Sequence, residues 1–302
     1  MPSLASVGEV GLIARWTKGL SYDNTVYVGV GDDAAVLCGG KDWRLLVTTD
    51  MLVDGVHFVG RVTPPQLIGR KALAVSLSDI AAMGGVPWAA IVAAGIPRGY
   101  SVHALDALYR GLRQLARQFN VQLIGGDTVR AKVLTLTVTL TGWVEPGNVV
   151  LRRGARVGDD VWVTGRLGGA VRTGRHLRFT PRVAAARHLV ARYHPTAMMD
   201  LSDGLASDLR QLARASRVGF RIDAMHLPRA VGARVGNALC DGEDFELVWT
   251  LAPSAGRRLA RAQDLGVRAT RIGMVTRARE GLVLVERSGR QRPLPAPRFR
   301  HF

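Results

Sequence analysis

The sequence RKALAVSLSDIAAMGG, residues 70–85, carries apolar residues at spacings of three and four and predicts the centre of a buried helix over Pro65–Met83. A second helix with the same spacing is predicted over Ser101–Asn120. Apolar and β-branched runs on either side of these helices predict four strands: Val26–Val30, Leu45–Thr49, Ala89–Ile96 and Val133–Val144. This alternation indicates an α/β (α+β) fold, with strands packed against two long helices.

The hydrophobic pattern of the sequence changes at EPGNVVLRRGARVGDD, residues 145–160, which has no periodicity and is rich in glycine and in charged residues. It predicts a boundary between an N-terminal α/β domain, residues 1–148, and a C-terminal α/β domain, residues 149–302. Further elements are predicted in the second domain: strands over 160–164, 219–223, 245–251, 267–273 and 281–286, and helices over 181–193, 204–217 and 254–264. The proline-rich tail is predicted to be extended.

Composition excludes several classes of protein. Of the 302 residues, 47% are hydrophobic and 22% charged, which excludes a disordered chain, a collagen and a coiled coil. Apolar stretches are too short to cross a bilayer, and Glu9 and Arg15 argue against a signal peptide. Two cysteines, Cys38 and Cys240, cannot form a disulfide framework. A cytoplasmic protein without membrane contact is expected.

The net charge of +17 belongs almost wholly to the second half of the chain. There are 13 basic and 11 acidic residues up to Val150, and 28 basic and 13 acidic residues after it. The arginines are scattered, and aromatic residues make up only 6% of the chain, which is poor material for stacking on bases. An arginine-rich solvated surface is therefore preferred over nucleic-acid binding.

Four aspartates follow apolar strands: Asp32 and Asp33 after VYVGVG, Asp50 after LLVTT, and Asp127 after VQLIGG. Asp79 lies inside the apolar helix, and Asp200 and Asp203 lie in MMDLSDG. Burying an isolated carboxylate is costly, and no lysine or arginine lies close enough in these segments to neutralise them. A hard divalent cation would do so, and oxygen ligands favour Mg²⁺. Each residue also has an ordinary interpretation: a turn residue, a helix N-cap for Asp203, or a partner of Ser76 for Asp79. The whole set favours the metal.

Nucleotide-binding motifs restrict the ways in which this chain could bind a nucleotide. The run GVGDDA, residues 29–34, fits G-x-G-x-x-A, but its two carboxylates would repel a pyrophosphate. No Walker A motif is present, which excludes a P-loop kinase. Phosphates would instead be held through Mg²⁺ and through glycine backbone at Gly125, Gly126 and Gly165 to Gly169.

Seven motifs in order resemble the thiamine-monophosphate kinase family: GVGDDAAVL, TTDMLVDGVHF, RKALAVSLSDIAAMGG, QLIGGDTVR, LRRGARVGDDVWVTG, MDLSDGLASDL and CDGEDFELVWT. This family belongs to a superfamily with aminoimidazole ribonucleotide synthetase, selenophosphate synthetase and the hydrogenase maturation dehydratase. The resemblance implies the two-domain aminoimidazole ribonucleotide synthetase-like fold, a homodimer formed through the N-terminal sheet, and a C-terminal domain closing over the active site. It implies transfer of the ATP γ-phosphoryl group to thiamine monophosphate with several Mg²⁺ ions, and leaves a K⁺ requirement open.

The motifs also assign residues. Family positions that bind Mg²⁺ fall on Asp33, Thr48, Thr49, Asp50, Asp79, Asp127, Asp200 and Asp203. ATP positions fall on Gly126, Asp127, Arg152 and Ser202. Substrate positions fall on His57, Glu243 and Phe299, the last where the family often has tyrosine. Asp50, Asp127 and Arg152 are the expected catalytic residues. Ordinary alternatives are a solvent-exposed histidine at 57, an acidic turn at 243 and a tail anchor at 299.

Two alternatives stay open at the level of sequence. One is another ATP-dependent member of the superfamily, such as aminoimidazole ribonucleotide synthetase or the hydrogenase maturation enzyme. The other is a basic module that binds a polyanion, which the carboxylates would hinder. The segment between Gly169 and Asp200 departs from the family in its length and its arginine content, so its structure is not predicted.

Overall fold

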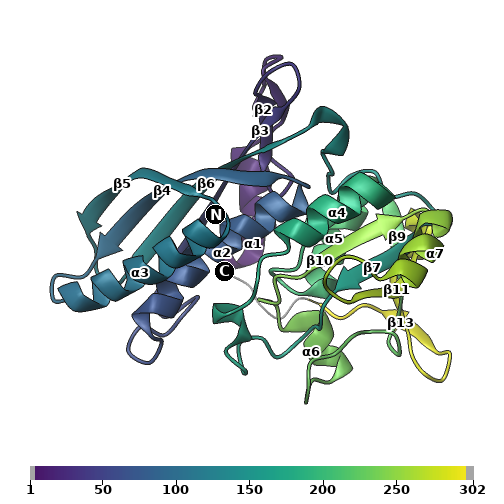
Figure 1. Cartoon of the computed structure of the whole chain (residues 1–302). Helices are drawn as coiled ribbons and strands as arrows, with labels where there is room; N and C mark the ends of the chain where they lie inside the picture. The colour runs from purple at the N-terminus through teal and green to yellow at the C-terminus, as the bar shows by residue number, and fades with distance from the viewer. Residues whose placement is uncertain (1–3, 297–302) are drawn as a thin grey trace.

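The computed structural model describes residues 4–296, which form two β-sheets flanked by helices (Figure 1). The first sheet has the strand order β1-β2-β3-β6-β4-β5. Its strands all come from the first half of the chain: β1 Val26–Val28, β2 Ala35–Cys38, β3 Arg44–Val53, β4 Val86–Ile96, β5 Gln122–Arg130 and β6 Thr135–Val144. All neighbouring pairs are antiparallel except β4 and β5, which are parallel.

Two long helices, α2 (Pro65–Ala82) and α3 (Val102–Gln118), pack on one face of this sheet. Pro65 begins α2, where its fixed φ suits a first turn, and the helix stops before Gly84, whose φ is 72°. Most of α2 is buried, which its apolar sequence requires. The predicted helices and the arrangement of strands against them are confirmed.

Strand alternation decides which side chains of β3 face the helices. Leu46, Thr48 and Leu52 are buried on the helix side, whereas Thr49 and Met51 are exposed on the other face. The same alternation runs along β6, so its buried apolar residues face α2. A one-residue difference in sequence therefore places a side chain on the opposite side of the sheet.

The second sheet has the order β13-β12-β9-β11-β7-β10-β8. Its strands lie in the second half of the chain: β7 Asp160–Thr164, β8 Ala197–Asp200, β9 Val218–Asp223, β10 Leu247–Leu251, β11 Ala269–Arg277, β12 Leu282–Val285 and β13 Gln291–Pro293. The helices of this half are α4 Val183–Tyr193, α5 Leu205–Ser216, α6 Val235–Cys240 and α7 Pro253–Ala262. Within residues 4–296, no helix is long and apolar enough to cross a membrane.

The main hydrophobic core runs through both halves of the chain. Leu73 and Ile80 of α2 belong to the same buried cluster as Leu189 of α4 and Trp249 of β10. A second cluster, which includes Leu209 of α5, lies within the second half. The last strand of the first sheet ends before residue 145, and the next strand begins at residue 160. The domain boundary at 148/149 stays a prediction.

Several elements were not expected from sequence. They are α1 (Leu4–Trp16), β2, β8, α6 and β13. Most of these are too short for a periodicity to show, and α1 is interrupted at Gly8, whose φ is 64°. The expectation that Asp50 and Asp127 follow their strands is wrong, because β3 and β5 each continue three residues beyond the aspartate. Phe299 lies outside the described residues.

Candidate active site

Three aspartates from distant elements converge where α2 meets β8. Asp33 lies in the turn between β1 and β2, Asp79 in α2, and Asp200 at the end of β8. A carboxylate oxygen from each lies within 4.8 Å of the others. Asp33 is 8% and Asp200 2% exposed, so water does little to screen them. The sequence prediction that these three residues form one group is confirmed by their geometry.

Hydroxyl groups, rather than cations, donate to most of this acidic group. Thr48 Oγ1 donates to Asp79 Oδ2 at 2.5 Å, and Ser78 Oγ donates to Asp200 Oδ2 at 2.6 Å. Asp50 points to the same side of β3 and accepts a hydrogen bond from Ser76 Oγ at 2.7 Å. Ser76 was considered as the partner of Asp79, but it bonds Asp50 instead. We call Asp33, Asp50, Asp79 and Asp200 the cleft carboxylates.

Burial and the charges of neighbouring carboxylates raise the pKa values of Asp50, Asp79 and Asp200. Desolvation, followed by the charge of Asp33, raises the pKa of Asp200 to about 8. Desolvation, followed by the charge of Asp50, raises the pKa of Asp79 well above its ordinary value. Asp33 Oδ2 is buried without a hydrogen-bond partner among the described residues. A set of buried carboxylate oxygens with an unbonded acceptor fits Mg²⁺.

Among residues 4–296, Arg152 is the one arginine that bonds this group. Its Nη2 lies 2.7 Å from Asp33 Oδ1, its Nη1 donates to Gln211, and its backbone N–H donates to Asp32 Oδ1 at 2.6 Å. The expectation that no arginine neutralises these segments is therefore wrong for Asp33. Arg152 comes 119 residues after Asp33, so local sequence could not show the contact. One guanidinium leaves most of the negative charge uncompensated.

The structure separates Thr49, Gly126 and Asp127 from the cleft carboxylates. Thr49 lies on the opposite face of β3 from Asp50, where its hydroxyl contacts Thr139 Oγ1 at 3.1 Å. Asp127 is exposed on the edge strand β5, beside Gly126. At Gly126 a Cβ would meet Val92 O at 1.9 Å, so the contact with β4 by itself requires glycine there.

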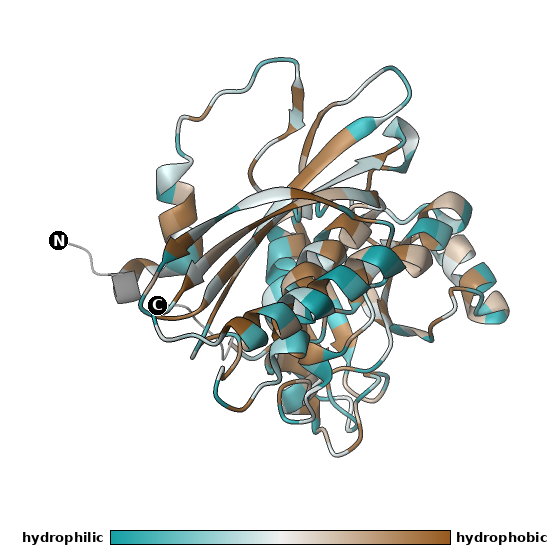
Figure 2. Cartoon of the chain, turned by 60° about the vertical axis from the view of Figure 1, so that its left-hand side comes forward, coloured by the Kyte–Doolittle hydropathy of each residue, from teal (hydrophilic) through white to brown (hydrophobic). Residues whose placement is uncertain are grey.

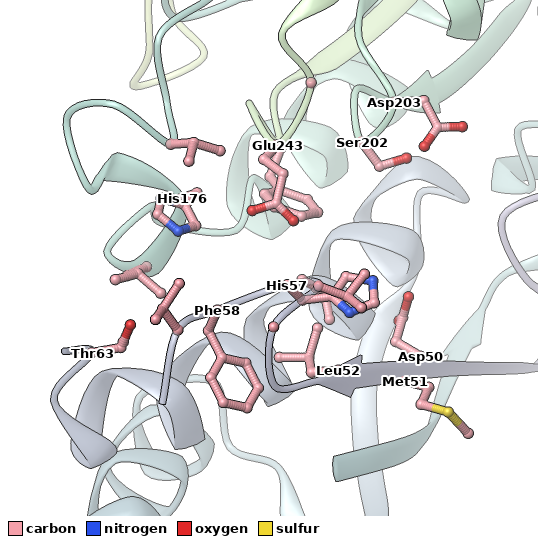
Figure 3. A pocket seen from close by; sticks show the side chains of 18 of the residues that line it. Asp50, Met51, Leu52, His57, Phe58, Thr63, His176, Ser202, Asp203 and Glu243 are labelled. Atoms are coloured by element: carbon pink, nitrogen blue, oxygen red, sulfur yellow. The ribbon is translucent and has the colours of Figure 1, made fainter. Parts of the chain in front are cut away.

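A cavity of about 590 Å³ adjoins the cleft carboxylates (Figure 3). Asp50, Ser202 and Asp203 lie at one end, and His57 and Glu243 lie near its middle. Asp203 does not cap α5, whose N-cap is Gly204 with no side-chain bond, so the N-cap interpretation is wrong. The structure thus brings five predicted site residues to one cavity.

Lys71 joins two of the three predicted substrate residues, His57 and Glu243, and sequence reasoning missed it. Its side chain is fully buried, and Nζ lies 2.5 Å from Glu243 Oε2 and 2.8 Å from His57 O. Burial lowers the pKa of Lys71, and the Glu243 carboxylate partly offsets this. A lysine inside the apolar run RKALAVSLSD was the available signal, because such a lysine needs a buried partner.

The loop that carries Glu243 is held in an unusual conformation. Glu243 has φ 55° and Phe245 has φ 49°, both in the left-handed region. The Glu243 N–H donates to Ser202 O at 2.7 Å, and the Phe245 ring stacks on Phe179 at 4.4 Å between centroids. Glu243 is therefore a positioned side chain, and the acidic-turn interpretation does not describe it.

His57 is half-buried at the cavity, so the solvent-exposed alternative is wrong. Its Nδ1 accepts a hydrogen bond from the Val53 N–H at 3.1 Å. In the neutral ring the proton is then on Nε2, which can donate to an anion.

A second residue missed from sequence is Asp208 in MDLSDGLASDL. Its side chain is fully buried, its two carboxylate oxygens accept no hydrogen bond among the described residues, and burial raises its pKa well above the ordinary value.

Several arginines of the basic half pair with carboxylates. Arg175 lies 2.6 Å from Asp244, Arg182 binds both oxygens of Glu246 at 2.7 and 2.6 Å, and Arg187 lies 2.7 Å from Glu145. Asp244 and Glu246 are 2% and 3% exposed. The interpretation of the arginines as a solvated surface is wrong for these three residues. They hold the segment that follows Gly169 against the body of the protein.

Both halves of the chain match one class of proteins. Residues 31–144 match the N-terminal domain, and residues 156–285 the C-terminal domain, of AIR synthase related protein.

Within that class, the curated relatives agree on one name. The thiamine-monophosphate kinase of Synechococcus elongatus is 36% identical over 99% of this chain and 98% of its own length. That of Bacillus subtilis is 35% identical over 97% of this chain and 99% of its own length. The chain belongs to the thiamine-monophosphate kinase family.

Solved structures agree with this placement. The structure of AaThiL complexed with AMPPCP and TMP superimposes with a TM-score of 0.86 at 29% identity, over 100% of this chain and 99% of that one. The HypE–HypF complex, at 19% identity and a TM-score of 0.77, shares the fold alone. The two-domain fold expected from the resemblance is confirmed.

Proposed function

We propose that this chain is an ATP-dependent kinase that transfers the γ-phosphoryl group of ATP to thiamine monophosphate and releases thiamine diphosphate. The observation that carries the proposal is the cavity that runs from the cleft carboxylates to His57 and Glu243. Relatives named thiamine-monophosphate kinase over nearly the whole length support it, as does the likeness to AaThiL complexed with AMPPCP and TMP.

The residue inventory suits transfer to a phosphate acceptor. The acceptor phosphate is largely dianionic at neutral pH, since its second pKa is about 6, so no strong general base is needed. Bringing two anions together is the obstacle, and bound Mg²⁺ would supply the positive charge that lowers it. The cleft carboxylates would hold Mg²⁺, and Arg152 would add positive charge at the Asp33 side. His57 Nε2–H and the carboxylate of Glu243 would contact the acceptor.

We place ATP against Arg152 and Ser202, beside the cleft carboxylates. Gly126 and Asp127 lie on β5, away from these two residues, and their contact with ATP stays a prediction. Asp127 and Thr49 lie on the exposed face of the first sheet, which also carries exposed apolar side chains: Met51, Trp88, Ile91, Ile124 and Val129. Figure 2 shows apolar segments along these strands. An exposed apolar face of this kind supports a homodimer formed through the sheet, with Thr49 and Asp127 at the interface.

Several Mg²⁺ ions and a cytoplasmic location complete the proposal. The acidic donor set supports the metal, and a content of only two cysteines suits a reducing compartment. A requirement for K⁺ stays a prediction from the family resemblance.

The direct experiment measures ADP release from Mg-ATP with thiamine monophosphate, thiamine or no acceptor, and identifies the product. Turnover only with the monophosphate is expected, and EDTA and Asp50→Asn should abolish it. Exposed Asp106→Asn on α3 is the matched control and should leave turnover unchanged. ATP consumption without thiamine diphosphate would favour a synthetase relative, and absence of ATP binding would refute an ATP-dependent enzyme.

A further inference from the structure

The end of the cavity opposite the cleft carboxylates contains a polar residue to which no role has been assigned. Figure 3 shows His176 and Thr63 at this end, with Glu243 and His57 between them and Asp50. Apolar side chains, including Phe58 and Leu177, form the walls around them. This end is an apolar compartment that contains an imidazole and a hydroxyl.

The His176 ring has a fixed tautomer. His176 lies in the short 3₁₀ segment Arg175–Leu177 and is 8% exposed. Its Nδ1 lies 3.1 Å from the carbonyl oxygen of Ala170. A carbonyl can only accept, so Nδ1 carries the proton, and Nε2 of the neutral ring is a bare acceptor. Among residues 4–296 no hydrogen bond reaches this Nε2.

The surroundings of His176 keep the ring neutral. Desolvation lowers its pKa, and the nearby charges of Lys71 and Arg178 act in the same direction, against that of Glu243. A neutral ring with Nδ1–H committed to Ala170 can accept a hydrogen bond but cannot donate one into the cavity. Thr63, in contrast, can do either. His176 therefore distinguishes ligand donors from ligand acceptors.

The proposed acceptor substrate presents a donor at its far end. Thiamine monophosphate carries its phosphate on one side of a cationic thiazolium ring and a 4-aminopyrimidine on the other. With the phosphate at the cleft carboxylates and the thiazolium near Glu243, the pyrimidine occupies the apolar compartment. Its exocyclic amino group then reaches the end of the cavity where His176 lies.

We propose that His176 is a specificity-determining residue whose Nε2 accepts a hydrogen bond from the exocyclic amino group of the substrate pyrimidine. The inference rests on the proposed function. A 4-oxo pyrimidine in the same place would set one acceptor against another, with no proton between them. The site therefore selects 4-amino over 4-oxo pyrimidines.

The test compares kcat/KM for thiamine monophosphate and for its 4-oxo analogue in the wild type, His176→Leu and His176→Gln. The wild type should prefer the amino substrate by about 10- to 100-fold more than His176→Leu does. The loss in His176→Leu should fall mainly on KM for the amino substrate and leave the 4-oxo analogue within about threefold. His176→Gln can present either an oxygen or an amide N–H, so it should reduce the preference while keeping turnover of both.

Exposed His103→Leu, on α3, is the matched control and should leave both substrates unchanged. Equal losses for both substrates in His176→Leu and in His176→Gln would show a merely structural histidine and overturn the inference, with the proposed function intact. An unchanged preference ratio would also overturn it. A wild type that phosphorylates neither compound would overturn the proposed function, and this inference with it.

Discussion

Two groups of buried carboxylates in this protein are neutralised in different ways. Asp244 and Glu246 bond the guanidinium groups of Arg175 and Arg182. The cleft carboxylates, which include the equally buried Asp200, receive mainly hydroxyl donors. Arginine side chains therefore compensate the charge of the first group, whereas the second group has only Arg152. The difference indicates that the first group stabilises the fold and that the second group is suited to bind a cation.

The largest effect is expected from Asp200→Asn. Removing this carboxylate should lower kcat/KM by about 10³-fold or more, because the charge that holds Mg²⁺ is lost. The metal-free variant should melt at the same temperature as the metal-free wild type or higher, since repulsion by Asp33 is relieved. Steady-state kinetics and thermal melts in EDTA check the two parts. A strongly destabilised variant would show that Asp200 is structural.

Arg182→Met should produce the opposite pattern. It leaves the buried Glu246 carboxylate with the Thr164 hydroxyl and the more distant Arg175 nitrogen at 3.8 Å, and should lower the free energy of unfolding by about 3 kcal/mol. Arg192→Met is the matched control, because Arg192 is 61% exposed and its pair with Asp264 should contribute less than about 1 kcal/mol. Urea denaturation measures both variants, and equal losses would contradict the comparison.

The pH dependence of the metal-free protein should separate the two groups. The folded-state pKa of Asp200 is about 8, against 3.8 ordinarily, so the folded protein holds a proton that the unfolded chain has lost. The free energy of unfolding should therefore fall as pH rises from about 4 to about 8, by up to about 1.4 kcal/mol per pH unit.

Saturating Mg²⁺ should remove that contribution by binding the ionised form. Burial also raises the pKa of Asp244, to about 7, but this residue lies in the arginine-paired group. Its contribution, which spans the narrower range from about pH 4 to about pH 7, should persist in Mg²⁺. Thermal melts between pH 5 and pH 9, with EDTA or with Mg²⁺, measure both slopes, and a slope that Mg²⁺ leaves unchanged would argue against metal binding by Asp200.

The smallest effect is expected from Ser78→Ala. This change removes the hydroxyl that orients Asp200, and should weaken Mg²⁺ binding about 10-fold while changing the stability by about 1 kcal/mol. Isothermal titration with Mg²⁺ gives the affinity. Thr173→Ala, whose hydroxyl bonds backbone carbonyls away from the cleft carboxylates, serves as the control and should leave the affinity unchanged.

Sequence predicted the fold well where a period was long enough to be seen. The apolar repeat of α2 and the threonine alternation of β6 each specify an element almost to the residue. The sequence also predicted that Asp33, Asp79 and Asp200 lie together, because several buried carboxylates can be stabilised by one shared divalent cation. It did not separate Thr49 from Asp50, since the strand was expected to stop at residue 49 and the alternation of faces was not applied beyond it.

Long-range partners were out of reach of the sequence. Lys71 meets Glu243, and Arg182 meets Glu246, across 172 and 64 residues of chain. A buried lysine or glutamate shows that some partner must exist, but the partner is chosen by tertiary packing. The same limit applies to His176, whose tautomer depends on the carbonyl of Ala170.

The shared core has a consequence for synthesis of the chain. One side of α2 is covered by α4 and β8, which begin about 100 residues after α2 ends. At the usual synthesis rate of about 5–20 residues per second, the apolar side of α2 stays exposed for roughly 5–20 s before α4 and β8 are synthesised. During this interval the newly made N-terminal half should be a client of ribosome-associated chaperones, and its expression should depend on them more than the activity of the finished protein does.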